Sequence, residues 1–321
     1  MIRQTPSCAG PSFRRALLSI LLPLALIGCP AGDGRDGRTF FLDEAFSALL
    51  PGLASQIGAA SIKAQDLSPA IKKSLSSSRG RSRTQPQPLL ASPLAARRIA
   101  EEAAILGLAS EEAMPPAVVF FSGSLLDLHP WIWNVEYDFE GAYASMGEKA
   151  VGESDPGAKI GILFQENFMR GSDALKAFER AVEAARGPGA VEVAIMEADP
   201  TQIDMSGRAE QALDKLAAAK PHVLVLAVDD AWAAWLLARE ARAKLGTGIK
   251  ALYADQTSWT LAGIGSRETF PRGEGPGEAP FSFRIEADQK RLARAAQGVL
   301  RSLETGRKVP KTTKVPLRLL H

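Results

Sequence analysis

Polar side chains of types that bind small ligands follow three apolar runs in the second half of the chain, at 160–164, 222–228 and 249–254. These polar residues are Gln165, Arg170, Asp229, Asp255 and Gln256. Carboxylates accept hydrogen bonds from hydroxyl groups, and a guanidinium group donates them in a fixed geometry. Such side chains at one edge of a sheet are typical of a site for a polar ligand. For an aspartate just before a helix, capping of the helix is an equally good interpretation.

Three tryptophans lie near these polar positions in the predicted fold. Trp232 comes shortly after Asp229, and Trp131 and Trp133 come after an apolar run at 117–121. An indole face covers the apolar side of a sugar or stacks on another ring. We therefore count the three tryptophans as candidate ligand contacts. Packing at the edge of a lobe is the alternative interpretation of Trp131 and Trp133.

The sequence lacks the common catalytic motifs. It contains three histidines, His129, His222 and His321, and no HExxH, GxSxG or GxxxxGK[ST] pattern occurs. No spacing among the acidic residues marks out a catalytic acid and base. We therefore predict that the protein is not an enzyme and that it uses no cofactor and no metal ion.

The elements that must position the polar residues alternate between strands and helices. Apolar runs predict strands over 160–164, 191–196, 222–228 and 249–254. Apolar residues at helical spacing predict helices over 171–186, 208–219 and 231–245. This alternation is typical of the α/β class, in which helices cover both faces of a parallel sheet. Ligands bind beyond the carboxyl ends of such strands, where the polar residues lie.

The first 28 residues have the features of a bacterial lipoprotein signal. Three arginines precede an apolar stretch at 16–27, and a small glycine comes directly before Cys29. We predict cleavage before Cys29, a lipid such as palmitate on this cysteine, and a flexible tether over 29–38. The protein would then be anchored to a membrane of the cell envelope and face the periplasm or the exterior. A plain secretory signal with an incidental cysteine is the alternative.

The net charge argues against a nucleic-acid partner. The chain has 38 Lys and Arg against 36 Asp and Glu. The predicted signal carries three arginines and no acidic residue, so its removal leaves the mature chain close to neutral. Nucleic-acid binding requires a concentrated positive surface, and we expect none here.

Several short segments occur in an order typical of one protein family. They are 135–138, 159–163, 227–231, 253–255, 283–285 and 306–310, with Arg170 in the loop after the second. Over residues 135–321 the chain thereby resembles the type I periplasmic binding proteins, the sugar-binding and LacI-like superfamily. The resemblance implies two Rossmann-like lobes with parallel sheets flanked by helices, joined by a multi-strand hinge. It also implies that Arg170, Asp229 and Asp255 contact the ligand and that the protein is a monomer.

The resemblance divides the chain between two lobes. We predict an N-terminal lobe from 39–155 and about 281–308, and a C-terminal lobe from 156–280 and about 311–321. Residues 77–93 are of low complexity, with three arginines close together, and this composition predicts an exposed or disordered loop.

These observations predict a membrane-tethered solute-binding protein of an ABC-type importer, with a permease as its partner. The ligand would be a small polar solute, a sugar or similar polyol, with a nucleoside or flavin-like ring as the alternative. The second hypothesis is a binding-protein-like lipoprotein that acts as the input of a membrane sensor or as a structural or interaction module. The low-complexity segment and the atypical first half motivate this second hypothesis.

Overall fold

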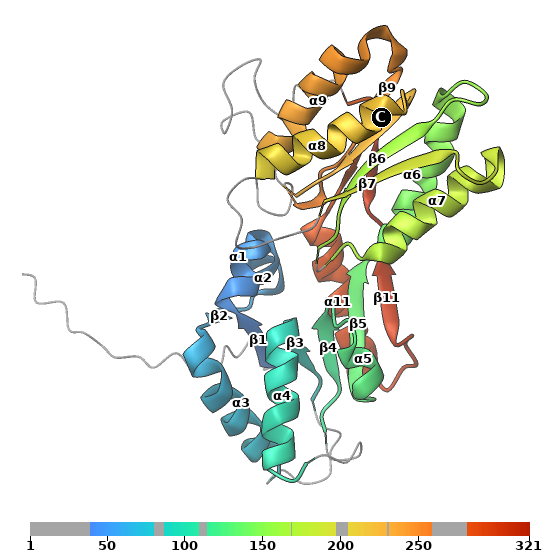
Figure 1. Cartoon of the computed structure of the whole chain (residues 1–321). Coiled ribbons are helices and arrows are strands. Elements are labelled where there is room, and N and C mark those ends of the chain that lie inside the picture. Colours follow the sequence, from blue (N-terminus) through green and yellow to red (C-terminus); the bar gives the residue numbers. More distant parts are fainter. Residues whose placement is uncertain are drawn as a thin grey trace, which may run out of the picture.

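The computed structural model of the chain describes residues 39–79, 87–108, 114–167, 169–196, 205–229, 231–258 and 281–321. Two sheets flanked by helices form two lobes (Figure 1). The predicted signal, the lipidation site Cys29 and the tether at 29–38 lie outside the described residues. None of the helices within the described ranges is long and apolar enough to span a membrane.

The first lobe contains a six-stranded sheet in the order β11-β5-β4-β3-β1-β2, in which neighbouring strands are parallel. Its strands are β1 (Thr39–Asp43), β2 (Ser61–Ile62), β3 (Leu89–Ala91), β4 (Ala117–Phe120), β5 (Ile132–Tyr137) and β11 (Thr312–Val315). Its helices are α1 (Glu44–Leu49), α2 (Pro51–Ile57), α3 (Ala64–Arg79), α4 (Pro93–Ile105), α5 (Leu125–Leu128) and α11 (Gln289–Glu304). Helices α1, α2 and α11 pack on one face, and α3 and α4 pack on the other.

Burial on both faces explains why β3 and β4, in the middle of this sheet, are apolar throughout and why the interior of β1 is apolar. In β1, Phe40 and Leu42 join the core under α2 and α11, whereas Phe41 joins the core under α3 and α4. Successive side chains of a strand point to opposite faces, so both sets need apolar residues here. The strand ends at Asp43, whose Oδ1 accepts a hydrogen bond from the backbone N–H of Phe46 at 2.9 Å and thereby caps α1.

The second lobe contains a six-stranded sheet in the order β12-β10-β9-β8-β6-β7, in which only the pairing of β10 with β12 is antiparallel. Its strands are β6 (Ile160–Gln165), β7 (Val191–Met196), β8 (Val223–Ala227), β9 (Ala251–Asp255), β10 (Phe283–Glu286) and β12 (Arg318–Leu320). Its helices are α6 (Phe139–Glu153), α7 (Ser172–Arg186), α8 (Met205–Ala218) and α9 (Ala231–Leu245), with a short 3₁₀ turn at Gly246–Gly248. The predicted alternation of strands and helices in this half is confirmed.

The second sheet also has two packed faces. In β6, Ile160, Ile162 and Phe164 lie in the core on the side of α6 and α7, and Leu163 lies in the core on the side of α8 and α9. Figure 1 shows α6 beside α7 on one side of this sheet and α8 with α9 on the other. Each lobe is therefore a three-layer α/β unit, as predicted.

The observed lobe boundaries differ from the predicted ones because sheet membership depends on pairing between strands that are distant in sequence. The predicted boundary at 155 places α6 in the first lobe, but α6 packs against α7 of the second. Strand β10 pairs with β9 of the second lobe, and β11 pairs with β5 of the first. The prediction placed β10 in the first lobe and β11 in the second.

The segment 77–93, predicted as an exposed or disordered loop, contains a strand. Helix α3 extends to Arg79, residues 80–86 lie outside the described part of the chain, and 89–91 form β3. All three residues of β3 are buried, and the strand pairs with β1 on one side and β4 on the other. The prediction is wrong for these residues because three apolar positions are too few to show the period of a strand.

Candidate functional site

The carboxyl edges of the two parallel sheets face each other where the chain passes between the lobes. Strand β5 leaves the first sheet at its carboxyl end, and Asp138 connects it to α6 of the second lobe. Strand β10 leaves the second sheet in the same way, and 287–288 connect it to α11 of the first lobe. Residues at either carboxyl edge therefore lie toward the opposite lobe, where open parallel sheets bind ligands.

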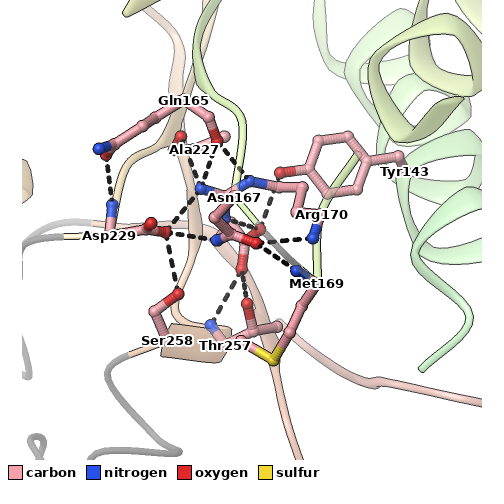
Figure 2. Close-up of polar contacts among 10 residues, drawn as sticks. Tyr143, Gln165, Asn167, Met169, Arg170, Ala227, Asp229, Thr257 and Ser258 are labelled. Atoms are coloured by element: carbon pink, nitrogen blue, oxygen red, sulfur yellow. Dashed lines mark hydrogen bonds and ion pairs between the residues drawn. The ribbon is translucent and has the colours of Figure 1, made fainter. Parts of the chain in front are cut away.

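Arg170 is the centre of a polar network at the carboxyl edge of the second sheet (Figure 2). The residue follows β6, and its side chain is fully buried. Its guanidinium donates to the backbone oxygen of Gln165 (2.9 Å from Nε and 2.7 Å from Nη2) and to that of Ala227 (3.2 Å). It also donates to Oδ2 of Asp255 at 2.5 Å and to Oδ1 of Asp229 at 2.8 Å. These acceptors compensate the loss of hydration of a buried positive charge.

Asp255 ends β9 and is fully buried, like Arg170. Its Oδ2 accepts hydrogen bonds from Arg170 and, at 2.8 Å, from the hydroxyl of Tyr143. Its Oδ1 accepts from the backbone N–H of Thr257 at 2.9 Å and from the hydroxyl of the same residue at 2.6 Å. Since a carboxylate offers about four acceptor sites, these bonds fill the capacity of Asp255. The residue therefore holds Arg170 in place from within the protein.

Asp229 differs from Asp255 because one of its oxygens is left open. Its Oδ1 accepts from Nδ2 of Asn167 at 2.7 Å, from Arg170 at 2.8 Å and from the hydroxyl of Ser258 at 2.9 Å. Its Oδ2 accepts no hydrogen bond from the residues that the structure describes, and the side chain is 32% exposed. Three donors on one oxygen fix the orientation of the carboxylate, and the other oxygen is left as an acceptor for a ligand.

The pKa values of two members of the network, Arg170 and Tyr143, are raised. Burial by itself lowers the pKa of Arg170, but the nearby Tyr143, Asp255 and Asp229 raise it above its ordinary value. Burial, followed by the charge of Asp255, raises the pKa of Tyr143 well above its ordinary value. Arg170 therefore stays positive and Tyr143 stays a hydrogen-bond donor near neutral pH. Across the described ranges, no group of three His, Cys, Asp or Glu side chains is arranged to hold a metal ion.

The two predicted glutamines also lie at this edge, and both are buried. The side-chain oxygen of Gln165 accepts from the backbone N–H of Asp229 at 2.9 Å. Gln256 directly follows Asp255, and its backbone N–H donates to the carbonyl oxygen of Ile285 in β10 at 2.9 Å. The structure therefore brings Gln165 into the network and Gln256 beside it.

Trp131 and Trp133 lie away from the network. Trp131 precedes β5 at the amino edge of the first sheet, where it is buried against His129 with ring centroids 5.2 Å apart. Trp133 lies early in β5, with Nζ of Lys311 3.7 Å from the centroid of its ring. These positions are at the opposite end of the strand from the carboxyl edge, so packing at the lobe edge describes both residues. Trp232 lies in the first turn of α9, and its side chain is outside the described part.

Aromatic side chains gather at the carboxyl edge of the first sheet and at the start of α6. The ring centroid of Phe46 lies 5.7 Å from that of Phe120 and 6.5 Å from that of Phe121. Tyr137 continues the contacts, at 5.9 Å from Phe121 and 6.4 Å from Phe139. These five buried residues are called the aromatic cluster below. The hydroxyl of Tyr137 is buried without a hydrogen-bond partner among the described residues.

The residues predicted for the site did not include four side chains of the polar network, those of Tyr143, Asn167, Thr257 and Ser258. Thr257 and Ser258 follow Asp255 closely, so their place after a strand end was a usable signal. Tyr143 lies on α6, 112 residues from its partner Asp255. No local pattern connects two such distant positions, because their contact depends on α6 packing in the second lobe.

Comparison with known proteins bears on the fold. The sequence matches no protein-family model and no curated protein sequence. A periplasmic ribose ABC transporter from Conexibacter woesei has a similar solved structure, with a TM-score of 0.56 and 15% identity over 91% of this chain and 93% of that one. A putative LacI transcriptional regulator from Bacteroides fragilis gives a TM-score of 0.52 and 12% identity over 88% of this chain and 95% of that one. A sugar transporter from Clostridium phytofermentans gives a TM-score of 0.51 and 15% identity over 87% of this chain and 96% of that one.

The strand order, the helical layers and these similarities define the fold. The chain has two mostly parallel α/β sheets flanked by helices and joined by several crossovers, which is the type I periplasmic binding protein fold. The fold class expected from the sequence is confirmed.

Proposed function

We propose that the protein is a solute-binding protein that holds a small neutral polar ligand, a sugar or a similar polyol, between its two lobes. The proposal rests on one observation, the open oxygen of Asp229. Oδ1 of this carboxylate is held by three donors, Oδ2 accepts none from the described residues, and the side chain is 32% exposed. A carboxylate that is fixed in this way is ready to accept a hydrogen bond from a ligand hydroxyl without reorganising.

The charges of the network favour an uncharged ligand that is rich in hydrogen-bond donors. One guanidinium, that of Arg170, is paired with the two carboxylates of Asp229 and Asp255, so the network is negative overall. A negative site disfavours anionic solutes such as sugar phosphates and carboxylic acids. Sugars and polyols offer several hydroxyl donors and no charge.

The fold supports the same class of ligand. Two of the similar structures are described as a ribose transporter and a sugar transporter. In a two-lobed protein, a ligand that contacts both lobes biases the equilibrium of the hinge toward the closed form. Binding of this kind requires no chemical step, in keeping with the expectation of a non-enzyme.

We further propose that the protein works outside the cytoplasm, tethered by a lipid on Cys29, and delivers its solute to an ABC permease. The motif that ends at Cys29 supports the anchor. Metabolic labelling of cells with an alkyne analogue of palmitate tests it. We expect label on the full chain and none on a Cys29→Ser variant. Equal labelling of the two would contradict the anchor.

A thermal-shift screen of the full chain in mild detergent tests solute binding. The panel contains pentoses, hexoses, polyols, nucleosides, riboflavin and amino acids. A ligand that binds only the folded protein raises the melting temperature. We expect a rise with a neutral sugar or polyol. A rise with nucleosides or riboflavin alone would replace the sugar class by the ring-shaped alternative.

Two variants serve as the matched pair for any ligand that the screen finds. Asp229→Asn keeps the shape of the side chain and removes the charged acceptor, so affinity should fall by about 10- to 100-fold, the range for a hydrogen bond to a charged group. Asp173→Asn changes an exposed aspartate on α7 that pairs with Lys176, and affinity should be unchanged. Equal affinities for both variants would remove Asp229 from the site.

A module that does not transport solutes is the second candidate, and the burial of the network favours it. Arg170 and Asp255 are fully buried, and each is hydrogen bonded within the protein. Such a network also serves to stabilise a lobe. Cooperative melting with no shift across the whole panel would favour a sensor input or an interaction module over a solute receptor.

A further inference from the structure

Tyr143 joins the polar network from α6, which is distant in the sequence from its partner Asp255. The residue lies on α6, just after the crossover at Asp138, and it is fully buried. Its ring contacts Phe139 at a centroid distance of 6.5 Å and Phe164 at 6.0 Å. Its hydroxyl donates to Oδ2 of Asp255 at 2.8 Å (Figure 2).

The hydrogen bonds form a chain from this hydroxyl to the open oxygen of the site. Oδ2 of Asp255 accepts from Tyr143 and from Nη1 of Arg170, and Nη2 of Arg170 donates to Oδ1 of Asp229. The other oxygen of Asp229 is the one proposed to accept from the ligand. Tyr143 is therefore three hydrogen bonds away from Asp229 and four from the proposed ligand, which it does not contact in this arrangement.

We propose that Tyr143 is a positioning residue for ligand recognition, acting through Asp255 and Arg170 on the carboxylate of Asp229. This inference rests on the proposed function. The hydroxyl of Tyr143 supplies one of the two donors to Oδ2 of Asp255, so it shares the charge of this oxygen with Arg170. Without the hydroxyl, Asp255 competes more strongly for the guanidinium, and the bond from Arg170 to Asp229 weakens. The carboxylate of Asp229 then loses part of its fixed orientation.

A matched pair of variants separates this role from packing. Tyr143→Phe removes only the donating hydroxyl and keeps the ring contacts. Tyr137→Phe removes a hydroxyl that is equally buried but has no hydrogen-bond partner among the described residues. We expect the affinity of the full chain for D-ribose, measured by calorimetry, to fall by about tenfold in Tyr143→Phe, the usual scale for a bond to a charged group. Tyr137→Phe should bind like the unaltered protein.

A double variant tests the route of the effect. If Tyr143 acts through Asp229, the two substitutions are coupled and their effects do not add. In an Asp229→Asn background, Tyr143→Phe should therefore change the affinity for D-ribose by less than about twofold. A full further loss of about tenfold in that background would overturn the proposal, as would equal losses in Tyr143→Phe and Tyr137→Phe.

A measurement without ligand keeps this test independent of the proposed function. Proton NMR of arginine-labelled full chain follows hydrogen exchange at Nε of Arg170, which is buried and bonded to the backbone oxygen of Gln165. Exchange should quicken in Tyr143→Phe by about tenfold and stay unchanged in Tyr137→Phe. Faster exchange without D-ribose binding to the unaltered protein would support the positioning of Arg170 and exclude D-ribose as the solute. Unchanged exchange and unchanged affinity in Tyr143→Phe would overturn the inference.

Discussion

The carboxyl edges of the two sheets differ in chemistry although the sheets have the same α/β architecture. The first edge carries the aromatic cluster, whose ring centroids lie 5.7 to 6.5 Å apart, and the polar residues Asp43 and Ser92 there pair with each other. The second edge is polar, with Arg170 at its centre. A ligand between the lobes would therefore find its charged hydrogen-bond partner on the second lobe, whereas the buried aromatic cluster packs the first lobe.

A buried aspartate ends a strand at each of these edges, and the two show how residue type alone misleads. In the first lobe, Asp43 accepts from the backbone N–H of Phe46 at 2.9 Å and from the hydroxyl of Ser92 at 2.5 Å. In the second lobe, Asp255 accepts four hydrogen bonds and holds Arg170. Only Asp229 combines a fixed oxygen with an open one among these three. The open acceptor atom, rather than an aspartate at a strand end, is what marks a ligand contact.

The largest expected effect concerns the stability of the second edge. Asp255→Ala leaves the fully buried guanidinium of Arg170 without its 2.5 Å partner. Breaking a buried ion pair from one side costs about 3–5 kcal/mol in the free energy of unfolding. Urea denaturation followed by circular dichroism measures this loss.

An exposed aspartate provides the control for this prediction. Asp173→Ala removes a carboxylate that is 71% exposed and paired with Lys176, and because solvent screens such a pair we expect no measurable change in the free energy of unfolding. If Asp255→Ala is as mild as this control, Arg170 does not depend on Asp255, and the contrast between the two edges loses its electrostatic basis.

The first edge should respond to the loss of packing rather than of charge. Phe46 is 5% exposed and stacks on Phe120, so Phe46→Ala should lower the free energy of unfolding by about 3 kcal/mol. Leu49→Ala on the same helix changes a side chain that is 52% exposed and should cost about 0.5 kcal/mol or less. Thermal denaturation compares the two variants.

The same Phe46→Ala variant tests whether the first edge contributes to ligand binding. If the aromatic cluster only supports the first lobe, the affinity for a bound solute changes by less than about twofold. A loss of affinity similar to that of Asp229→Asn would place the first edge among the ligand contacts and break the comparison.

The sequence predicted the second lobe well because its elements carry strong local signals. Strand 191–196 was expected at the residues where β7 lies, and helices 171–186 and 231–245 match α7 and α9 within one residue at each end. These elements show apolar runs or helical spacing of sufficient length. The three-residue strand β3 lacks such a length, and the places of β10 and β11 depend on pairing with distant strands. Local patterns contain no information on this pairing.

The grouping of the candidate residues was predictable where these residues follow strands. Gln165, Arg170, Asp229 and Asp255 come together as expected from parallel strands whose carboxyl ends share an edge. The sequence could not show which of these carboxylates has all its acceptor sites filled and which keeps an open oxygen, because this depends on single atoms. Trp131 and Trp133 were misplaced because the sequence did not show that they lie at the amino end of β5.

A smaller effect should come from backbone strain at the first edge. Phe121 has a φ of 49°, in the left-handed region that disfavours residues with a Cβ atom. Both Phe121→Ala and Phe121→Gly remove the ring, but glycine also relieves the strain. We expect the glycine variant to be more stable than the alanine variant by about 1 kcal/mol in urea denaturation.

The neighbouring position should show the reverse order. Ser122 is not among the described residues with positive φ, so Ser122→Ala should be more stable than Ser122→Gly by about 0.5–1 kcal/mol. If alanine is the better residue at both positions, the backbone relaxes at Phe121 and the first edge is not strained.

The smallest expected effect concerns an ion pair that connects the two lobes. Lys314 of β11 in the first lobe lies 2.7 Å from Glu140 of α6 in the second, and both side chains are more than 40% exposed. The hydrogen bond to Glu140 raises the pKa of Lys314 above its ordinary value of 10.5. A raised pKa means that the stabilisation is complete below pH 10.5 and is lost as the pH rises through the folded value. Because exposed pairs are screened, Lys314→Met should cost only about 0.5 kcal/mol at pH 8, as measured by urea denaturation, and the difference from the unaltered protein should shrink above pH 10.5. A difference that is constant across this range would mean that the aliphatic part of Lys314, and not its charge, contributes to the contact between the lobes.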